Sequence, residues 1–105
     1  MAKKFVSTMR KGFQMTFENG LTASVQWGAG NYCDNHFPED MDFSCKRDAS
    51  SDTAEVAVIY KGKLIDIDEF LPEHCSSDFT VAGWLSPEDV LYFLNKVSEF
   101  KPTEA

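Results

Sequence analysis

Apolar and polar residues alternate along residues 13–27, which is the pattern of β-strands that bury one face. The alternation covers residues 13–17 and 21–27, and the interruption between the two runs includes Asn19-Gly20. An Asn-Gly pair between alternating runs favours a tight turn that joins antiparallel strands. The pattern therefore predicts a β-hairpin over residues 13–27.

The length of this turn follows from the face that each side chain must take. A two-residue loop would pair Glu18 with Leu21 and would put the two apolar rows on opposite faces, because directly paired residues share a face. A three-residue loop pairs Phe17 with Leu21 instead and keeps both rows together. We predict the longer loop, with Gly20 in the left-handed conformation of a G1 bulge.

A second run of alternating apolar residues occupies positions 53–68 and is interrupted at residues 61–62 by Lys-Gly. Here a two-residue loop keeps the apolar side chains on one face of the ribbon. The pairs that this loop aligns are Val58 with Ile65 and Val56 with Ile67. The pattern predicts a second β-hairpin over residues 53–68.

The last periodic segment has the spacing of an amphipathic α-helix. Its start signals are Ser86 as the N-cap, Pro87 at the first helical position and Asp89 three residues after the cap. Pro102 prevents continuation at the other end. We predict a C-terminal helix over residues 86–99. The apolar stripe that we expect to face the sheet consists of Val90, Leu91, Phe93, Leu94 and Val97.

The order of these elements predicts an α+β fold. Residues 28–52 lack periodicity and are predicted to form a long loop, whereas residues 4–9 and 79–82 have the composition of short extended segments. Only one helix is predicted and it comes last, so the alternation of strands and helices that builds a parallel sheet is missing. We expect residues 1–105 to form a single domain. Its antiparallel β-sheet of hairpins, with about five strands, packs against one C-terminal α-helix.

The composition fits a folded, acidic protein. Hydrophobic residues make up 43% of the 105 residues, which is too large a share for a disordered chain. The net charge of −7 disfavours direct contact with nucleic acid or with an anionic membrane, because both would repel it. An acidic surface can instead imitate a nucleic acid, but the acidic residues are spread along the chain, as is typical of a surface that serves solubility.

The chain is expected to be cytoplasmic. No apolar run is long enough to span a bilayer, and the first residues lack the apolar stretch of a secretion signal. Cysteines in a reducing compartment remain thiols, and the odd number of three cysteines also argues against a disulfide framework.

Five residues are of the types that bind zinc: Cys33, His36, Cys45, His74 and Cys75. Their spacing gives little support to a site, because only the first two form a short pair and the last two are adjacent. We therefore predict no metal site and no cofactor, and metal binding by these five residues is left open.

Candidate catalytic groups are sparse. Cys75 follows His74 directly, but neighbours on a strand point to opposite faces and make a poor pair of nucleophile and base. Asp66 and Asp68 are expected to share a strand face and could hold a hard cation, although a solvent-facing strand explains them equally well. We predict a non-enzymatic protein, and a metal-dependent enzyme is retained as a less favoured alternative.

The start of the long loop is the predicted binding site. Gly28-Ala29-Gly30 could form an anion-binding nest, but no helix follows it, which excludes a phosphate loop or a dinucleotide site. What remains is a glycine-flexed loop that carries aromatic and amide side chains, and Tyr and Trp are favoured at protein interfaces. The predicted binding residues are Trp27, Gly28, Gly30, Asn31 and Tyr32.

The predicted function is non-enzymatic binding of a protein partner through this loop. The alternative is a small, nucleotide-like ligand held by the same loop, and a homo-oligomer is left open. A simpler structural interpretation is that Trp27 completes the apolar row that begins at Leu21, while the glycines only form a tight bend.

Two stretches of the sequence resemble small uncharacterised proteins of phages and mobile elements. The first runs from Phe17 to Gly28 and on through Asn31-Tyr32-Cys33, and the second is Gly83-Trp84-Leu85-Ser86-Pro87-Glu88-Asp89-Val90. Together they cover about a fifth of the chain. The resemblance implies a small accessory protein that acts against a host or defence factor, and it supplies no activity and no catalytic residue.

Overall fold

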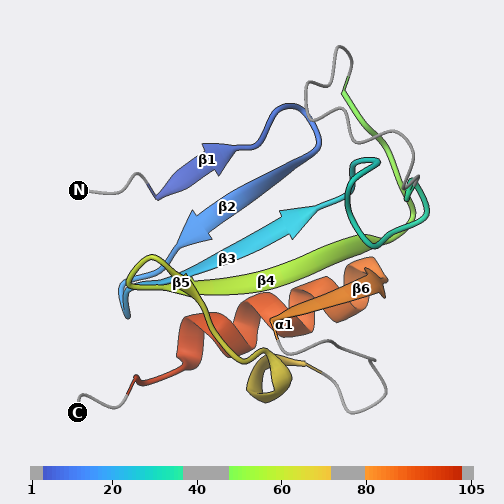
Figure 1. Ribbon diagram of the computed structural model, residues 1–105. Helices are drawn as coiled ribbons and strands as arrows, with labels where there is room; N and C mark the ends of the chain where they lie inside the picture. Colours follow the sequence, from blue (N-terminus) through green and yellow to red (C-terminus); the bar gives the residue numbers. More distant parts are fainter. Residues whose placement is uncertain (1–3, 37–47, 72–79, 103–105) are drawn as a thin grey trace.

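The computed structural model describes residues 4–36, 48–71 and 80–102. In these residues a six-stranded antiparallel sheet packs against one C-terminal α-helix, which confirms the predicted α+β class (Figure 1). The strands are β1 (Phe5–Ser7), β2 (Gly12–Thr16), β3 (Leu21–Gln26), β4 (Ala54–Tyr60), β5 (Lys63–Leu64) and β6 (Val81–Leu85). The helices are the 3-10 turn η1 (Asp68–Phe70) and the α-helix α1 (Pro87–Glu99).

The strands β1, β2, β3 and β4 lie in sequence order, and two short strands share the outer edge of β4. Near the end of β4, Ile59 and Tyr60 pair with β5. Near its start, Ala54, Val56 and Ala57 pair with β6, with a register shift between the first two of these residues. The last strand before the helix therefore lies beside β4, which pairs with β3 along one edge and with β5 and β6 along the other.

The first hairpin has the predicted register. Phe13 pairs with Val25 and Met15 pairs with Ala23, so the two apolar rows share one face of the sheet. The turn is the three-residue loop that this register requires, and Gly20 has a φ angle of +88°. A side chain at this position would strain the backbone, because the left-handed region is unfavourable for L-residues.

The second hairpin follows the prediction only near its turn. Lys61 and Gly62 both have positive φ angles, as a two-residue type I′ turn requires, and the Ile65 amide donates to the Val58 carbonyl at 3.0 Å. The predicted pairing of Val56 with Ile67 is wrong, because the chain leaves the sheet and enters η1. This departure places Ile67 in the core, and it frees the edge of β4 for β6.

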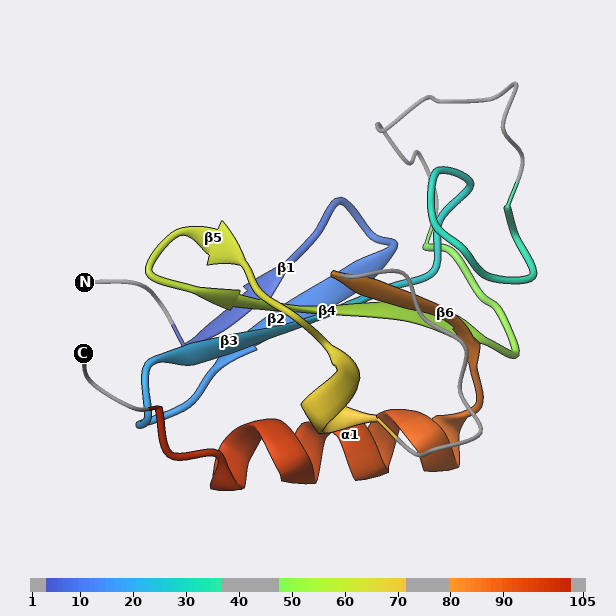
Figure 2. The same ribbon diagram turned by 60° about the horizontal axis from the view of Figure 1, so that its bottom comes forward.

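The core lies between the sheet and α1. Figure 2 shows the helix running beneath one face of the sheet, and it contacts β3, β4, β6 and η1. The buried residues of this layer are Leu21, Ala23, Val25, Ala54, Val56, Val58, Ile67, Phe70, Ala82, Leu85, Phe93 and Val97. All are apolar, so their removal from water is the main force that holds the helix on the sheet.

The start of α1 is formed as the sequence predicts. Ser86 is the N-cap, and its Oγ accepts a hydrogen bond from the Asp89 amide at 3.2 Å. Of the predicted apolar stripe, Phe93 and Val97 are fully buried. The prediction that Leu91 faces the sheet is wrong, because its side chain is 60% exposed. The stripe is wider than the contact between helix and sheet, and Leu91 lies on the flank that this contact leaves open.

The end of α1 is capped from the first hairpin. The Asn19 side-chain amide donates to the carbonyls of Val97 at 2.7 Å and Phe100 at 2.8 Å, and its Oδ1 accepts from the Leu21 amide at 3.0 Å. The last carbonyls of a helix lack the usual partners four residues on, and this amide adds to the Phe100 amide, which donates to the Val97 carbonyl at 3.3 Å. One turn residue thus joins the first hairpin to the C-terminal helix.

Candidate functional site

The loop that follows β3 is built around the side chain of Asn31. Its Oδ1 accepts from the Gly28 amide at 2.9 Å, and its Nδ2 donates to Glu55 Oε1 at 3.1 Å. Both ends of this amide are therefore used inside the protein. Asn31 was predicted to contact a partner, and the structure gives it the role of holding the loop in shape.

The backbone of Tyr32 is fixed to two strands. Its amide donates to Glu55 Oε2 at 3.0 Å, and its carbonyl accepts from the Trp84 amide at 2.9 Å. Glu55 belongs to β4 and Trp84 to β6, so the loop is held against both strands. A side chain mounted on such a framework loses little conformational entropy when it binds something.

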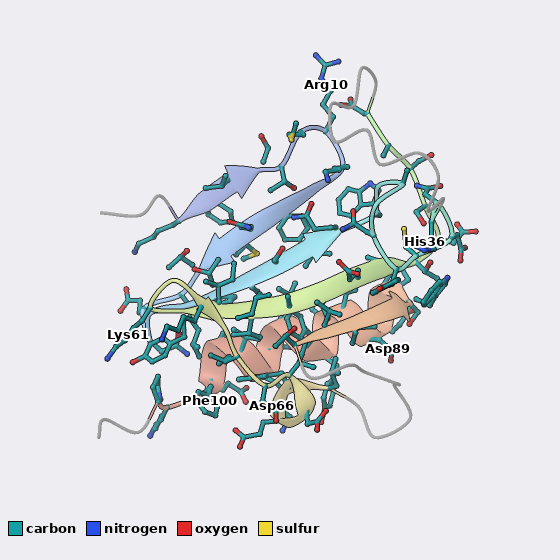
Figure 3. All side chains as sticks on the ribbon, viewed as in Figure 1. Arg10, His36, Lys61, Asp66, Asp89 and Phe100 are labelled. Carbon is teal, nitrogen blue, oxygen red and sulfur yellow. The ribbon has the colours of Figure 1, made fainter. Side chains whose placement is uncertain are left out.

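Three aromatic rings meet on this framework, and we call Tyr32, His36 and Trp84 the aromatic cluster. The Tyr32 and Trp84 rings are stacked with centroids 5.8 Å apart, and the His36 ring lies 5.2 Å from the first and 6.1 Å from the second. Tyr32 is 44% exposed and Trp84 is 53% exposed. Figure 3 shows His36 at the end of the sheet, where the loop lies beside β4.

His36 is held in place by two contacts with the backbone of its own loop. Its Nδ1 lies 3.0 Å from the Asn31 carbonyl oxygen, and its own amide donates to the Cys33 carbonyl at 2.9 Å. These contacts fix the ring at the side of the Tyr32 and Trp84 stack. The cluster is thus a defined surface of three rings, with two of them about half open to solvent.

The backbone at Trp84 has an unusual conformation for its residue type. Its φ angle is +55°, in the left-handed region, and it lies in the part of β6 where the register with β4 shifts. A non-glycine residue in this region costs about 1 to 3 kcal/mol, and such conformations concentrate at functional sites. Here the hydrogen bond to Tyr32 and the stacked rings hold it in place.

Gly83 is required for the cluster to close. A Cβ atom at this position would lie 2.5 Å from Tyr32 Cβ and 2.6 Å from the Tyr32 carbonyl oxygen. Non-bonded contacts of a Cβ atom are essentially never this short. One of the two is to a backbone atom, which cannot move aside as easily as the end of a side chain. Only glycine at this position lets the loop approach β6 closely enough for the two rings to stack.

The stack between Tyr32 and Trp84 is closed, which limits what the cluster can bind. The two rings are inclined by only 26° and contact each other, so a planar ligand cannot sit between them without displacing one. Their outer faces and edges are what solvent and a partner can reach. The arrangement suits contact with another surface better than enclosure of a small molecule.

Trp27 lies apart from this cluster. Its indole Nε1 donates to the Ala49 carbonyl at 2.9 Å, and its ring packs edge-on against Phe13 at 6.1 Å. This placement agrees with the interpretation that Trp27 continues the apolar row of β3. Of the predicted binding residues, the structure brings Asn31 and Tyr32 together, whereas the Trp27 ring packs against Phe13 and is not part of the cluster.

The two predicted glycines of the loop differ in surroundings. Gly28 is buried, and a Cβ atom there would lie 2.6 Å from the Lys11 side chain, so this position serves close packing. Gly30 is half-buried.

Cys33 lies beneath the loop as a buried thiol. Its Sγ lies 3.5 Å from the Gly28 carbonyl oxygen, and burial raises the pKa of this thiol above its ordinary value. A buried, protonated thiol is a weak nucleophile, which argues against catalysis at this position.

The structure does not assemble a metal site in the residues that it describes. Within residues 4–36, 48–71 and 80–102, no three His, Cys, Asp or Glu side chains are placed to hold an ion. Cys45, His74 and Cys75 lie outside these ranges. Asp66 and Asp68 do not share a strand face, because Asp66 Oδ1 accepts from the Asp68 amide at 3.0 Å and the chain turns into η1 there.

The sequence interpretation missed Trp84 and Glu55 as parts of the site. Trp84 follows a glycine in a short extended segment, and its partner Tyr32 lies far away in the sequence, so no local pattern links them. The two stretches that carry the resemblance, residues 17–33 and 83–90, contribute Tyr32 and Trp84 to the stacked contact, and neither stretch contains Glu55.

Comparison with known proteins adds no relative. No protein-family model, no curated protein and no solved structure matches the chain. Among the described residues, no helix combines the length and the apolar character that crossing a bilayer requires.

Proposed function

We propose that this chain is a non-enzymatic binding protein that contacts a protein partner through the aromatic cluster. The observation that carries this proposal is the exposure of Tyr32 and Trp84, which are 44% and 53% open to solvent although each ring already contacts the other. Tyr and Trp are enriched among the residues that contribute most to binding at protein interfaces.

Rigidity supports the same conclusion. The Tyr32 backbone is bonded to Glu55 and to Trp84, and the Trp84 backbone is held in an unfavourable conformation. Such conformations cost stability and cluster at functional sites, which supports a binding role for the ring that this one presents. Rings fixed in advance bind a partner without first losing freedom of rotation.

The charges around the cluster favour a basic partner. The Glu55 carboxylate supports the loop, Asp34 is exposed on the same loop, and the whole chain carries a net charge of −7. Opposite charge accelerates the approach of a partner and favours its correct orientation. The same charges disfavour a nucleotide-like ligand, because its phosphates would lie close to carboxylates.

The biological setting that we propose follows from the resemblance to small phage and mobile-element proteins. Both stretches that carry it contribute a ring to the cluster, namely Tyr32 from residues 17–33 and Trp84 from residues 83–90. An accessory protein that acts on a host or defence factor by contact needs a binding surface and no catalytic group. We therefore propose that the cluster is the surface that meets this factor in the cytoplasm.

Site-specific photocrosslinking tests the proposal. Benzoylphenylalanine in place of Tyr32 puts a reactive ring on the cluster, and the same group in place of Tyr92 puts one on α1. The two positions are 44% and 42% exposed, so they differ in location and hardly in access to solvent. We expect a defined crosslinked product in host cells from position 32 and none of the same mass from position 92.

Trp84→Ala in the same background is expected to abolish the product from position 32. Crosslinking of equal strength from both positions would contradict the proposal, because it would show contact without preference for the cluster. Native mass spectrometry of the freshly purified protein separates the alternatives. A retained mass of a few hundred daltons would favour a small ligand, and a retained metal ion would favour a metal-dependent protein.

A further inference from the structure

An apolar groove runs along the flank of α1, on the side of the helix that faces β2. It has a volume of about 310 Å³. Its lining residues come from β2, β3, the segment before β4, β6 and the helix, and those that shape it most are Phe13, Trp27, Leu85, Val90, Leu91 and Leu94. Of the described residues that line it, Asp52 alone is charged. The groove is distinct from the aromatic cluster, with which it shares no residue.

The groove exists because one helix is too narrow for this sheet. An α-helix is about 10 Å wide and neighbouring strands are about 4.8 Å apart, so α1 covers roughly two strands. It lies over β3 and β4 and also contacts β6. The same face of the sheet continues on β2 and β1, where Phe5 pairs with Met15 and is 74% exposed.

The helix flank that forms one wall is uncharged. Pro87, Leu91 and Leu94 line it, and Leu91 is 60% exposed. The charged residues Glu88, Lys96 and Glu99 belong to other sides of α1. At 1.5 Å per residue, the wall from Pro87 to Leu94 is about 10 Å long. A bound helix spans the same length with three apolar side chains at positions i, i+3 or i+4, and i+7.

We propose that this groove receives an amphipathic α-helix of a partner protein, with its apolar side against Phe13, Trp27 and Leu91. The bound helix would lie beside α1 and cover the part of this sheet face that α1 leaves exposed. The one charged residue of the described lining, Asp52, is acidic and the chain carries a net charge of −7, so the partner helix is expected to carry basic residues at the end that meets Asp52.

A second copy of this chain fits the groove less well. In the described part of the chain α1 is the single α-helix, and its apolar side is buried on its own sheet through Phe93 and Val97. Only the flank with Leu91 remains to meet another copy, and it offers a narrower apolar surface than an amphipathic helix of a partner. Two copies would also bring together two chains of charge −7.

A designed peptide tests the groove directly. The probe is a fluorescein-labelled helical peptide of about 14 residues with leucines spaced three and four apart and with lysine and alanine elsewhere. Its control is a peptide of the same composition in scrambled order. We expect the wild-type protein to bind the probe at micromolar concentration and the scrambled peptide at least about tenfold more weakly, as the loss of one well-buried side chain would give.

Leu91→Gln and Leu64→Gln are the matched variants. Both leucines are largely exposed, at 60% and 51%, so neither substitution removes a core contact, and neither changes the charge. We expect the variant at position 91 to weaken probe binding about tenfold and the variant at position 64 to bind as the wild type does. Thermal unfolding followed by circular dichroism confirms that both variants are folded.

Intrinsic fluorescence gives an independent readout of location. The chain has two tryptophans, so Trp84→Phe leaves Trp27 in the groove as the single emitter. We expect its emission to shift to shorter wavelength when the probe binds. Equal binding of the scrambled peptide, unchanged binding by Leu91→Gln, or a dimer in sedimentation that Leu91→Gln dissociates would each overturn the proposal. The last result would assign the groove to a second copy.

Discussion

The two tryptophans of this chain have opposite surroundings although each stands next to a glycine. Trp27 is half-buried, its indole N–H is bonded to the Ala49 carbonyl, and it packs against Phe13. Trp84 is largely exposed, its backbone lies in the left-handed region, and its ring stacks on Tyr32. The Trp27 ring packs against its own sheet, whereas the Trp84 ring forms part of the exposed surface.

The comparison shows that composition near a residue does not decide its role. Trp27 continues a row of alternating apolar residues, and the sheet fixes its direction before any loop is placed. The position of Trp84 depends on a contact with a loop that lies far away in the sequence. A ring held by its own strand serves stability, whereas a ring held by a distant loop is free to serve binding.

Replacing each tryptophan by alanine should give the largest contrast. We expect Trp27→Ala to lower the free energy of unfolding by about 3 kcal/mol, because it removes a large half-buried ring that packs against Phe13 and the hydrogen bond to the Ala49 carbonyl. Trp84→Ala is expected to cost about 1 kcal/mol or less, the value of one stacked pair. Urea unfolding followed by circular dichroism measures both, and equal losses would show that Trp84 is a structural residue.

Gly83→Ala should disturb the cluster without removing a ring. The new Cβ would collide with the side chain and carbonyl of Tyr32, so we expect a loss of about 2 kcal/mol and a weaker near-ultraviolet circular dichroism signal. Gly62→Ala is the control, because its Cβ would meet nothing within 4 Å and only the φ angle of +79° opposes it. Its expected cost is about 1 kcal/mol, with the aromatic signal unchanged.

Asn31→Asp should loosen the loop by charge alone. The substitution keeps the acceptor for the Gly28 amide and puts a second carboxylate where Glu55 Oε1 lies 3.1 Å away. We expect a loss of about 1 to 2 kcal/mol at neutral pH that becomes smaller in acid, because protonation of either carboxyl removes the repulsion between the two charges. A loss that is independent of pH would mean that the amide acts by shape and not through Glu55.

Cys33, beneath the same loop, should give the smallest effect and a defined pH dependence. Burial raises the pKa of its thiol, so the unfolded chain ionises at lower pH than the folded one. The folded state is therefore favoured fully below the ordinary thiol pKa and loses stability as the pH rises from that value through the raised pKa of the folded thiol. Cys33→Ala should show a flatter decline in stability over this range, and a parallel decline would place the thiol in contact with water.

The parts of the fold that were predicted correctly follow from local rules. The register of the first hairpin follows from the requirement that Phe17 and Leu21 share a face, and the start of α1 follows from the sequence Ser86-Pro87. Each of these rules involves residues within a few positions of one another. Local backbone geometry decides them before the rest of the chain is placed.

The parts that were predicted wrongly depend on long-range competition. Val56 had two available partners, and Ala82 of β6 takes the place expected for Ile67 because Ile67 is buried better beside η1. Leu91 belongs to the apolar stripe of α1, but the helix sits where Phe93 and Val97 are buried most completely. The aromatic cluster also depends on long-range contacts, because its rings come from residues far apart in the sequence and no local pattern predicts that they meet.

Asn19 gives the molecule a link between its earliest and its latest parts. Synthesis produces the turn long before the carbonyls of Val97 and Phe100 that its amide binds. The hairpin can therefore close before this link can form, because Asn19 and Val97 are 78 positions apart in the sequence. A contact that closes so long a loop is expected to form later than the local turns.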